Sequence, residues 1–201
     1  GQVEAASTFG IAAPYNVFTF SNFTGNGTDS IGRMAVGGDF NPGGSGTGSF
    51  TIASGRSGDS PAVYDLVVAG NFYNNNASLG GGSMFVGGNM TWNNPTLPGN
   101  AVVNGNFSNN GHGSAGGSIS YYGTYSSTGT LSHTKMTATV ANPIDFVSAK
   151  TSLTQLSTYL AGTSANGTVT KSYSNYTLNG SNSSLNVFNM TDTALSGFAL
   201  T

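Results

Sequence analysis

The chain has no cysteine and very few charged side chains. Without cysteine it can form no disulfide, no thiolate zinc site and no cysteine nucleophile. Only 6% of its 201 residues are Asp, Glu, Lys or Arg, against about 25% in an ordinary soluble domain. Because five Lys plus Arg and a net charge of −2 provide no basic stripe for a phosphate backbone, we expect no nucleic-acid partner.

Long apolar runs are missing as well. No run approaches the ~20 apolar residues that a membrane-spanning helix needs, so we expect no membrane span. The chain opens on Gly1-Gln2-Val3 without a charged-then-apolar leader, which favours a processed or trimmed N-terminus. A hydrophobic content of 37% argues against disorder, although the chain is rich in Gly and Ser.

A short phrase recurs along the chain at nearly constant spacing. Its four clear copies are Val36-Gly37-Gly38-Asp39-Phe40, Val68-Ala69-Gly70-Asn71-Phe72, Val86-Gly87-Gly88-Asn89-Met90 and Val103-Asn104-Gly105-Asn106-Phe107. They are separated by 32, 18 and 17 residues. Weaker copies lie at Thr19–Phe23 and Tyr121–Tyr125, and Ile52-Ala53-Ser54-Gly55 would divide the long step evenly. Such a short period is typical of a solenoid.

Aligned by phase, the seven copies form columns of similar residues. Two mainly apolar columns, two positions apart as on one face of a strand, are Val17, Met34, Phe50, Leu66, Met84, Ala101, Ile119 and Thr19, Val36, Ile52, Val68, Val86, Val103, Tyr121. Small residues form the next column, which predicts a tight corner: Ser21, Gly38, Ser54, Gly70, Gly88, Gly105, Gly123.

Two further columns follow the small one. A polar turn ladder is predicted for Asn22, Asp39, Gly55, Asn71, Asn89, Asn106, Thr124. An apolar stack is predicted for Phe23, Phe40, Arg56, Phe72, Met90, Phe107, Tyr125, in which Arg56 is the misfit. The five columns predict a mainly β protein, a parallel β-helix with rungs of about 17 residues between about residues 15 and 140.

A different period begins near residue 144. Phe146, Ala149, Leu153, Leu156 and Leu160 follow one another at steps of 3, 4, 3 and 4, which predicts one amphipathic α-helix over about 144–161. Pro143 and Asp145 suit its start and Gly162 its end. We expect the helix to pack along the side of the solenoid, closing strands over about 168–201, and a single domain over 1–201.

Several segments, in this order, resemble the choice-of-anchor A family over nearly the whole chain. They are Tyr15-Asn16-Val17-Phe18, Asp29, Gly32-Arg33-Met34-Ala35-Val36-Gly37-Gly38-Asp39, Asp65-Leu66-Val67-Val68-Ala69-Gly70-Asn71, Asn142-Pro143-Ile144-Asp145-Phe146 and Leu185-Asn186-Val187-Phe188-Asn189. The resemblance implies a secreted or surface-displayed microbial adhesive β-solenoid with a flanking helix, and it supplies no catalytic or cofactor residue. Members usually continue past a segment like Leu195-Ser196-Gly197-Phe198, so the mode of attachment is not predicted here.

No catalytic or metal constellation stands out. His112 and His133 are isolated from any nearby acid, and the carboxylates are scattered at Glu4, Asp29, Asp39, Asp59, Asp65, Asp145 and Asp192. A glycosidase needs two acids in one cleft and a calcium site needs several clustered oxygen ligands, so we predict no enzyme, metal or cofactor. A Ser-His-Asp triad is the minority alternative. The glycines at Gly43-Gly44 and Gly80-Gly81-Gly82 lack the Gly-Lys-Ser/Thr of a phosphate loop.

Asn-x-Ser/Thr sequons are frequent, and we expect glycosylation chiefly between Asn175 and Asn182 if the host has the machinery. The sequons are at Asn22, Asn26, Asn76, Asn89, Asn106, Asn166, Asn175, Asn179, Asn182 and Asn189. Those at Asn22, Asn89 and Asn106 belong to the predicted ladder, where a glycan would not fit easily.

Three functions remain open. The first is an extracellular adhesive or matrix protein that binds glycans, matrix or other cells. Outward aromatic side chains among Tyr73, Trp92, Tyr121 and Tyr122 are candidates for sugar stacking, although an inward core role is favoured for each of them. The second is a fibre subunit that stacks through the open solenoid ends. The third is ice binding through a hydroxyl-rich but irregular outward column, Thr24, Asn41, Ser57, Tyr73, Thr91, Ser108 and Ser126.

Overall fold

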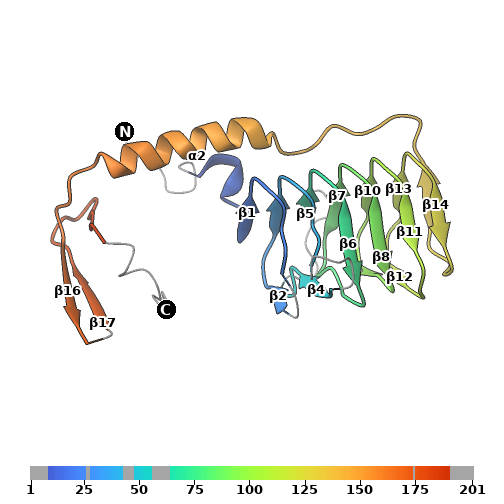
Figure 1. The fold of residues 1–201 in the computed structure, drawn as a ribbon, viewed down its shortest axis with the longest axis horizontal. Coiled ribbons are helices and arrows are strands. Elements are labelled where there is room, and N and C mark those ends of the chain that lie inside the picture. The colour runs from blue at the N-terminus through green and yellow to red at the C-terminus, as the bar shows by residue number, and fades with distance from the viewer. Residues whose placement is uncertain (1–8, 26–27, 43–47, 56–63, 174, 191–201) are drawn as a thin grey trace. The chain divides into compact units, whose positions relative to one another are not determined.

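The computed structural model describes residues 9–25, 28–42, 48–55, 64–173 and 175–190. The chain divides into two compact units, Gly1–Ser152 and Leu153–Thr201. The first unit holds a parallel β-solenoid, as the columns predict (Figure 1). Helix α2 begins within the last residues of this unit. The predicted single domain stays a prediction.

Three faces of parallel strands make up the solenoid. The first face is a seven-stranded sheet of β1 (Val17–Thr19), β3 (Met34–Val36), β5 (Tyr64–Val68), β7 (Ser83–Val86), β10 (Ala101–Val103), β13 (Ile119–Tyr121) and β15 (His133–Lys135). The second face contains β6 (Phe72–Asn75), β8 (Met90–Asn93), β11 (Phe107–Asn109) and β14 (Tyr125–Ser127). The third face contains the pairs β2 (Thr28–Ser30) with β4 (Phe50–Ile52) and β9 (Thr96–Leu97) with β12 (Ser114–Ala115).

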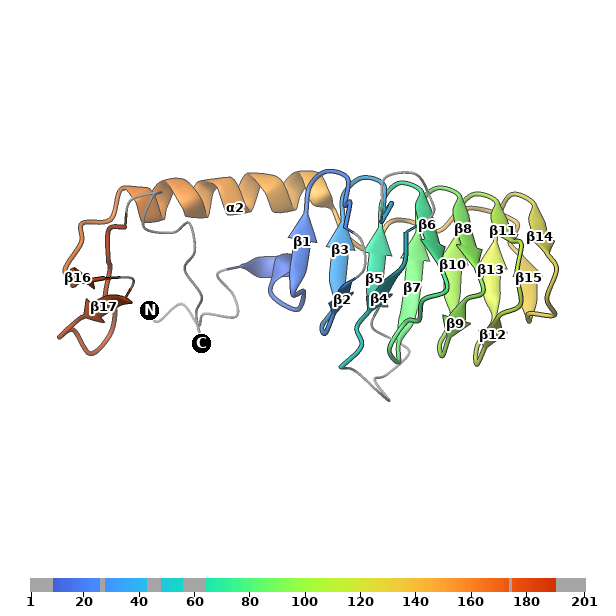
Figure 2. The same ribbon diagram turned by 60° about the horizontal axis from the view of Figure 1, so that its bottom comes forward.

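Short bridges extend the second and third faces. Phe23 pairs with Phe40 and Phe40 with Phe72, which continues the second face by two turns. Ile52 pairs with Leu79, and Ser78 pairs with Thr96, which joins the two strand pairs of the third face. Each turn of the chain therefore visits the three faces in order before it rises to the next level (Figure 2).

The predicted register holds along the first face except at one copy. Met34 pairs directly with Leu66, and Val36 with Val68, across the step of 32 residues. The predicted copy at Ile52-Ala53-Ser54-Gly55 is therefore wrong: Phe50 and Ile52 lie on the third face and pair with β2. The long step is one enlarged turn rather than two rungs. Arg56, the misfit of the apolar stack, lies outside the described residues.

The lumen is filled by stacked apolar side chains. The predicted stack is confirmed on the second face, where the rings of Phe23, Phe40 and Phe72 lie 5.3 and 5.1 Å apart and within 8° of parallel. Farther along, Phe107 stacks on Tyr125 at 5.2 Å. Stacking the same type of side chain at successive levels removes these rings from water and adds aromatic contacts.

The polar ladder is confirmed at the corner between the first and second faces. Each side-chain oxygen accepts a hydrogen bond from the backbone N–H one turn later, through the contacts Asn22 to Asp39, Asp39 to Asn71, Asn71 to Asn89, Asn89 to Asn106 and Asn106 to Thr124, at 2.7–2.9 Å. Gly55 takes no part in this series. The ladder satisfies corner N–H groups that no strand pairs.

The small column next to the ladder has a different cause from the one predicted. Its members Gly38, Gly70, Gly88, Gly105 and Gly123 do not adopt the positive φ that a glycine corner allows. A Cβ at each of them would instead strike the ladder oxygen of the previous turn. Glycine is therefore required by the close approach of stacked turns rather than by backbone conformation.

Helix α2 (Phe146–Ala161) occupies nearly the predicted range. Oδ1 of Asp145 accepts hydrogen bonds from the backbone nitrogens of Val147 and Ser148, at 3.1 and 3.0 Å, so Asp145 is the N-cap. Ala149 is the one buried residue of the helix, and Leu160 is 51% exposed, so its apolar face is not buried along its whole length. In the first unit, Ile144 and Phe146 pack against the outer side of the first face.

The second unit contains an antiparallel hairpin of β16 (Thr168–Ser172) and β17 (Asn175–Asn179). These strands were predicted to close the same body. They pair with each other and form a separate two-stranded sheet. Residues 191–201, the remainder of the predicted closing strands, lie outside the described residues.

Candidate functional site

The outer side of the first face is apolar and covered at β3, β5 and β7. Its outward residues Ala35, Val67 and Phe85 are completely buried, and they form one cluster with Ile144 and partly buried Phe146. Phe18 belongs to the same cluster, and its ring lies 5.4 Å from that of Phe146. This side is therefore occupied within the chain itself.

The segment that leads from β15 to this cover is pinned to the solenoid. The Asn104 side chain donates a hydrogen bond from Nδ2 to the carbonyl oxygen of Val140, at 2.7 Å. Its Oδ1 accepts one from the Val140 backbone nitrogen, at 2.9 Å. Residues 136–143 thus return along the solenoid (Figure 1) and bring Ile144 over the first face.

The outer side of the second face carries a row of polar side chains. Along β6, β8 and β11 the inward residues are buried and the residues between them are half-buried. This alternation is typical of a strand with one side facing solvent. The pairing aligns the outward residues Thr24, Asn41, Tyr73, Thr91, Ser108 and Ser126 from turn to turn. These belong to the column proposed from the sequence, and its remaining member, Ser57, lies outside the described residues.

Tyr73 is the one aromatic residue of this row. It stands between the buried residues Phe72 and Asn74 and is half-buried, so its ring belongs to the outer side. Two residues on, Asn75 Oδ1 accepts a hydrogen bond from Asn93 Nδ2 at 2.7 Å, and Asn93 Oδ1 accepts one from the Asn110 backbone nitrogen at 3.1 Å. A phenol ring therefore lies beside a row of ordered amides.

The other candidate aromatic residues lie elsewhere. Trp92 is completely buried in the core, and its indole Nε1 has no hydrogen-bond partner among the described residues. Tyr121 packs against the core cluster as a partly buried residue. Tyr122 is 44% exposed, at the corner that follows β13. Of these four residues only Tyr73 thus lies on the outer side of the second face, since Trp92 points inward from β8.

A second polar row lies on the third face, which the repeat columns did not predict. The pairings align Asp29 with Thr51, Ser78 with Thr96, and Thr96 with Ser114. Ile52 also pairs with Leu79, so the residues just before them, Thr51 and Ser78, are aligned with each other. Apart from Asp29 the row consists of small hydroxyl side chains. It escaped the sequence analysis because this face lies in the part of each repeat whose length varies.

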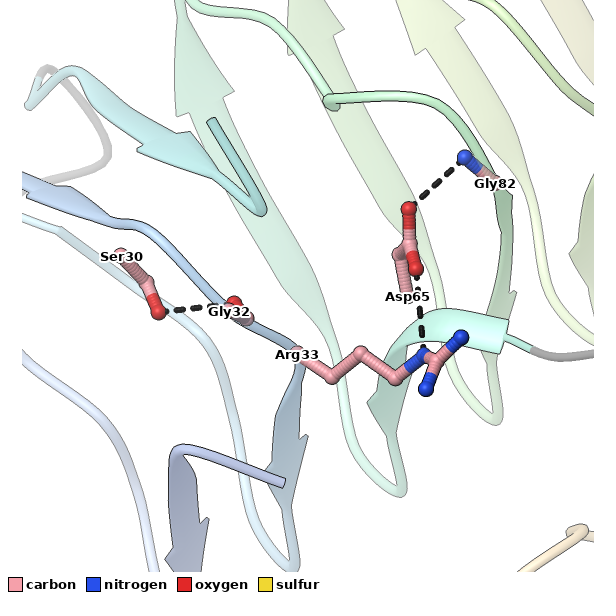
Figure 3. A network of polar contacts seen from close by, with 5 residues as sticks. All are labelled: Ser30, Gly32, Arg33, Asp65 and Gly82. Atoms are coloured by element: carbon pink, nitrogen blue, oxygen red, sulfur yellow. Dashed lines mark hydrogen bonds and ion pairs between the residues drawn. The ribbon is translucent and has the colours of Figure 1, made fainter. Parts of the chain in front are cut away.

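A buried ion pair lies at the start of the strands of the first face (Figure 3). Asp65 is completely buried; its Oδ1 lies 3.3 Å from Arg33 Nε, and its Oδ2 accepts a hydrogen bond from the Gly82 backbone nitrogen at 2.7 Å. The same corner continues upward, where Asn100 Oδ1 accepts a bond from the Ser118 nitrogen. Asp65 is therefore a structural carboxylate within the wall.

The remaining titratable candidates do not converge. His112 is exposed, and His133 stacks on Tyr125 at a ring distance of 3.8 Å. Asp29 is exposed, Asp39 belongs to the ladder and Asp145 caps the helix; Glu4, Asp59 and Asp192 lie outside the described residues. In the described part of the chain no three His, Asp or Glu side chains could hold a metal ion. The absence of catalysis and of a cofactor stays a prediction.

Hydrogen bonds of the cap lower the pKa of Asp145. The largest cause is the bond from the Ser148 backbone nitrogen, followed by the Ser148 hydroxyl. Burial raises the pKa of Tyr15, and the charge of Arg33 opposes this rise. Asp145 caps the helix and Tyr15 packs against the apolar cluster of the first face, so both shifts occur at groups with a structural role.

Six of the ten sequons fall into two groups. Asn22, Asn89 and Asn106 use their side-chain oxygens in the ladder, as expected. Asn175, Asn179 and Asn182 are exposed in the second unit. No helix in the described ranges is long and apolar enough to cross a membrane.

Comparison with known families gives one match. Residues 8–101 and 82–200 match the model of a family described as "Putative Ice-binding-like adhesive domain". The two matches overlap and together extend over nearly the whole chain. No curated protein and no solved structure gives a significant match.

Proposed function

The chain belongs to the family of ice-binding-like adhesive domains, and on this premise we propose that it is a non-enzymatic extracellular adhesion protein that binds neutral glycans. The family supports a surface location and an adhesive role. The specific choice-of-anchor A assignment is also part of the proposal, since it accounts for the segments around Arg33, Asp65 and Asp145.

The observation that carries this proposal is the outward row of the second face around Tyr73. A sugar ring offers an apolar face and many hydroxyl groups, and an aromatic ring beside amides and hydroxyls matches both. Thr91 and Ser108 continue the row with hydroxyl groups. Neither a carboxylate nor a cation belongs to the row, which favours a neutral ligand.

The strands also hold this surface rigidly. The Tyr73 backbone nitrogen donates to the Phe40 carbonyl oxygen at 2.8 Å, and the Asn75–Asn93 amide bond fixes the neighbouring side chains. A preorganised surface loses little side-chain entropy on binding. The first face, in contrast, is covered by Ile144 and Phe146.

A glycan array followed by calorimetry on the best glycan tests the proposal. Tyr73→Ala should weaken binding at least tenfold, which corresponds to about 1.4 kcal/mol. Tyr122→Ala removes an exposed tyrosine at the corner after β13, away from the second-face row, and should leave affinity unchanged. Silence of the folded wild-type chain on the array, or equal effects of the two variants, would contradict glycan binding through the second face.

Ice binding is the second candidate, and the third face favours it. Thr51, Ser78, Thr96 and Ser114 form a row of small hydroxyl side chains with the near 4.8 Å spacing of paired strands and no projecting aromatic residue. Fluorescence microscopy of labelled protein on ice crystals would show adsorption. Thr96→Lys should abolish it, whereas Thr91→Lys on the second face should not.

A further inference from the structure

The last strand of the first face breaks the pattern of the lumen. Ile119 of β13 pairs with His133 of β15, and Tyr121 pairs with Lys135. His133 therefore ends the inward column that begins Val17, Met34, Leu66, Met84, Ala101 and Ile119, and Lys135 ends the column of Val36, Val68, Val86 and Val103. Two positions that are mainly apolar in the turns below thus become titratable at the final level.

Both side chains are in contact with water. His133 and Lys135 are exposed, whereas their counterparts Ala101 and Val103, two levels below, are completely buried. The imidazole of His133 stacks on Tyr125 with the ring planes within 13°, and its Nδ1 lies 2.9 Å from the Leu131 carbonyl oxygen. Leu131 is buried in the core cluster. His133 and Leu131 therefore close the top of the lumen, with the polar side chain outermost.

These two residues lie on an edge strand whose backbone could pair with another strand. β15 is the terminal strand of the seven-stranded sheet, and a terminal strand has unpaired N–H and C=O groups that can template another chain. The chain has only five Lys plus Arg in 201 residues. A lysine two positions from a histidine on this strand is therefore a marked local concentration of basic side chains.

We propose that His133 and Lys135 form a cap that keeps β15 from pairing with a second copy of this chain. A strand laid in parallel on β15 would place its own inward residues over His133 and Lys135. The charge of Lys135 would then lose its contact with water, which opposes this pairing. Terminal repeats of solenoids need such a polar end to remain soluble.

This inference bears on the fibre alternative rather than on glycan binding. With this cap the solenoid stays monomeric at the β15 end, and its lateral faces remain available for binding. The fibre interpretation requires pairing through the open ends of the solenoid. His133 and Lys135 place exposed polar side chains on the last strand at one of these ends.

The test is the double variant His133→Val/Lys135→Val, measured by size-exclusion chromatography with light scattering over a concentration series. We expect a mass that rises with concentration for the double variant and a constant monomer mass for the wild type. Thr134→Val, whose side chain lies between the two on the outer side of the same strand, should stay monomeric. Electron microscopy should show end-to-end particles in the associated sample.

A third variant keeps the test decisive if the double variant folds poorly. His133→Val/Lys135→Glu retains a charge at the last level and should remain monomeric. A folded double variant that stays monomeric, a wild-type chain that already associates end to end, or association of the Lys135→Glu variant would each overturn the cap.

Discussion

The backbone nitrogen of Asn71 lies 2.7 Å from Oδ1 of Asp39, although the two residues are 32 positions apart. The same oxygen accepts a second bond from Asn71 Nδ2, at 3.2 Å. This contact joins the two ends of the enlarged turn and keeps the polar ladder continuous through it. An insertion is tolerated because both of its ends remain fixed to adjacent levels.

Removal of the Asp39 side chain should therefore destabilise the solenoid. Asp39→Ala leaves the Asn71 N–H without its acceptor, which costs about 1–3 kcal/mol in free energy of unfolding. Asp39→Asn keeps an acceptor oxygen and should cost clearly less. Urea unfolding of the three proteins measures both values, and equal losses for the two variants would show that the ladder contact is not the cause.

The space beside the ladder gives a second prediction. A Cβ on Gly88 would lie 2.6 Å from Asn71 Oδ1 and 2.9 Å from the Gly70 carbonyl oxygen. Gly88→Ala should therefore lower stability by about 1–3 kcal/mol through overpacking. At Gly129 the nearest atom would lie 3.5 Å away, so Gly129→Ala is the matched control and should be nearly neutral. Thermal melts of both variants check this difference.

The buried ion pair gives a third prediction. Arg33→Met leaves the completely buried carboxylate of Asp65 without its cation, a change that typically costs about 3–5 kcal/mol. Arg33→Met/Asp65→Leu removes both charges and should recover part of that loss. Chemical unfolding of the single and double variants measures the recovery. A double variant that is less stable than Arg33→Met would argue that the Asp65 bond to Gly82 matters more than the pair.

The returning segment 136–143, which we call the strap, gives a fourth prediction. Asn104→Ala deletes both side-chain bonds to Val140. Amide exchange at Val140 and its neighbours should become faster, while exchange in β7 and β10 should stay slow, because those strands are held by backbone pairs. Hydrogen exchange read by mass spectrometry resolves the two regions. Unchanged exchange at Val140 would mean that the apolar contacts of Ile144 alone hold the strap.

The helix cap gives a prediction about pH. Folding lowers the pKa of Asp145 below its ordinary value of 3.8, so its stabilising effect is present above that value and is lost as the pH falls through the folded pKa. Helix content followed by circular dichroism should decline at that step in the wild type. Asp145→Asn retains a capping side chain that does not titrate and should lack the step. A step of equal size in the variant would assign it to another group.

The architecture of the solenoid was largely predictable from the sequence, and its turn lengths were not. A stacked coil places like residues at each level, so the columns through Val68, Asn71 and Phe72 were visible as repetition and gave the correct register. The enlarged turn defeated this reasoning because Phe50 and Ile52 imitate the same apolar pair. Only strand pairing assigns them to the third face.

The functional surface shows the same division. The alternation along β6 placed Tyr73 among the outward candidates, and the structure separates it from Trp92 by burial. The third-face row, the buried pair of Arg33 with Asp65 and the polar last level at His133 and Lys135 depend on contacts between residues that follow no common spacing. Periodicity is a local property of the chain and so determined the rungs. Which sides are covered, and where the coil ends, were decided by tertiary packing, because only contact between distant segments removes a side chain from water.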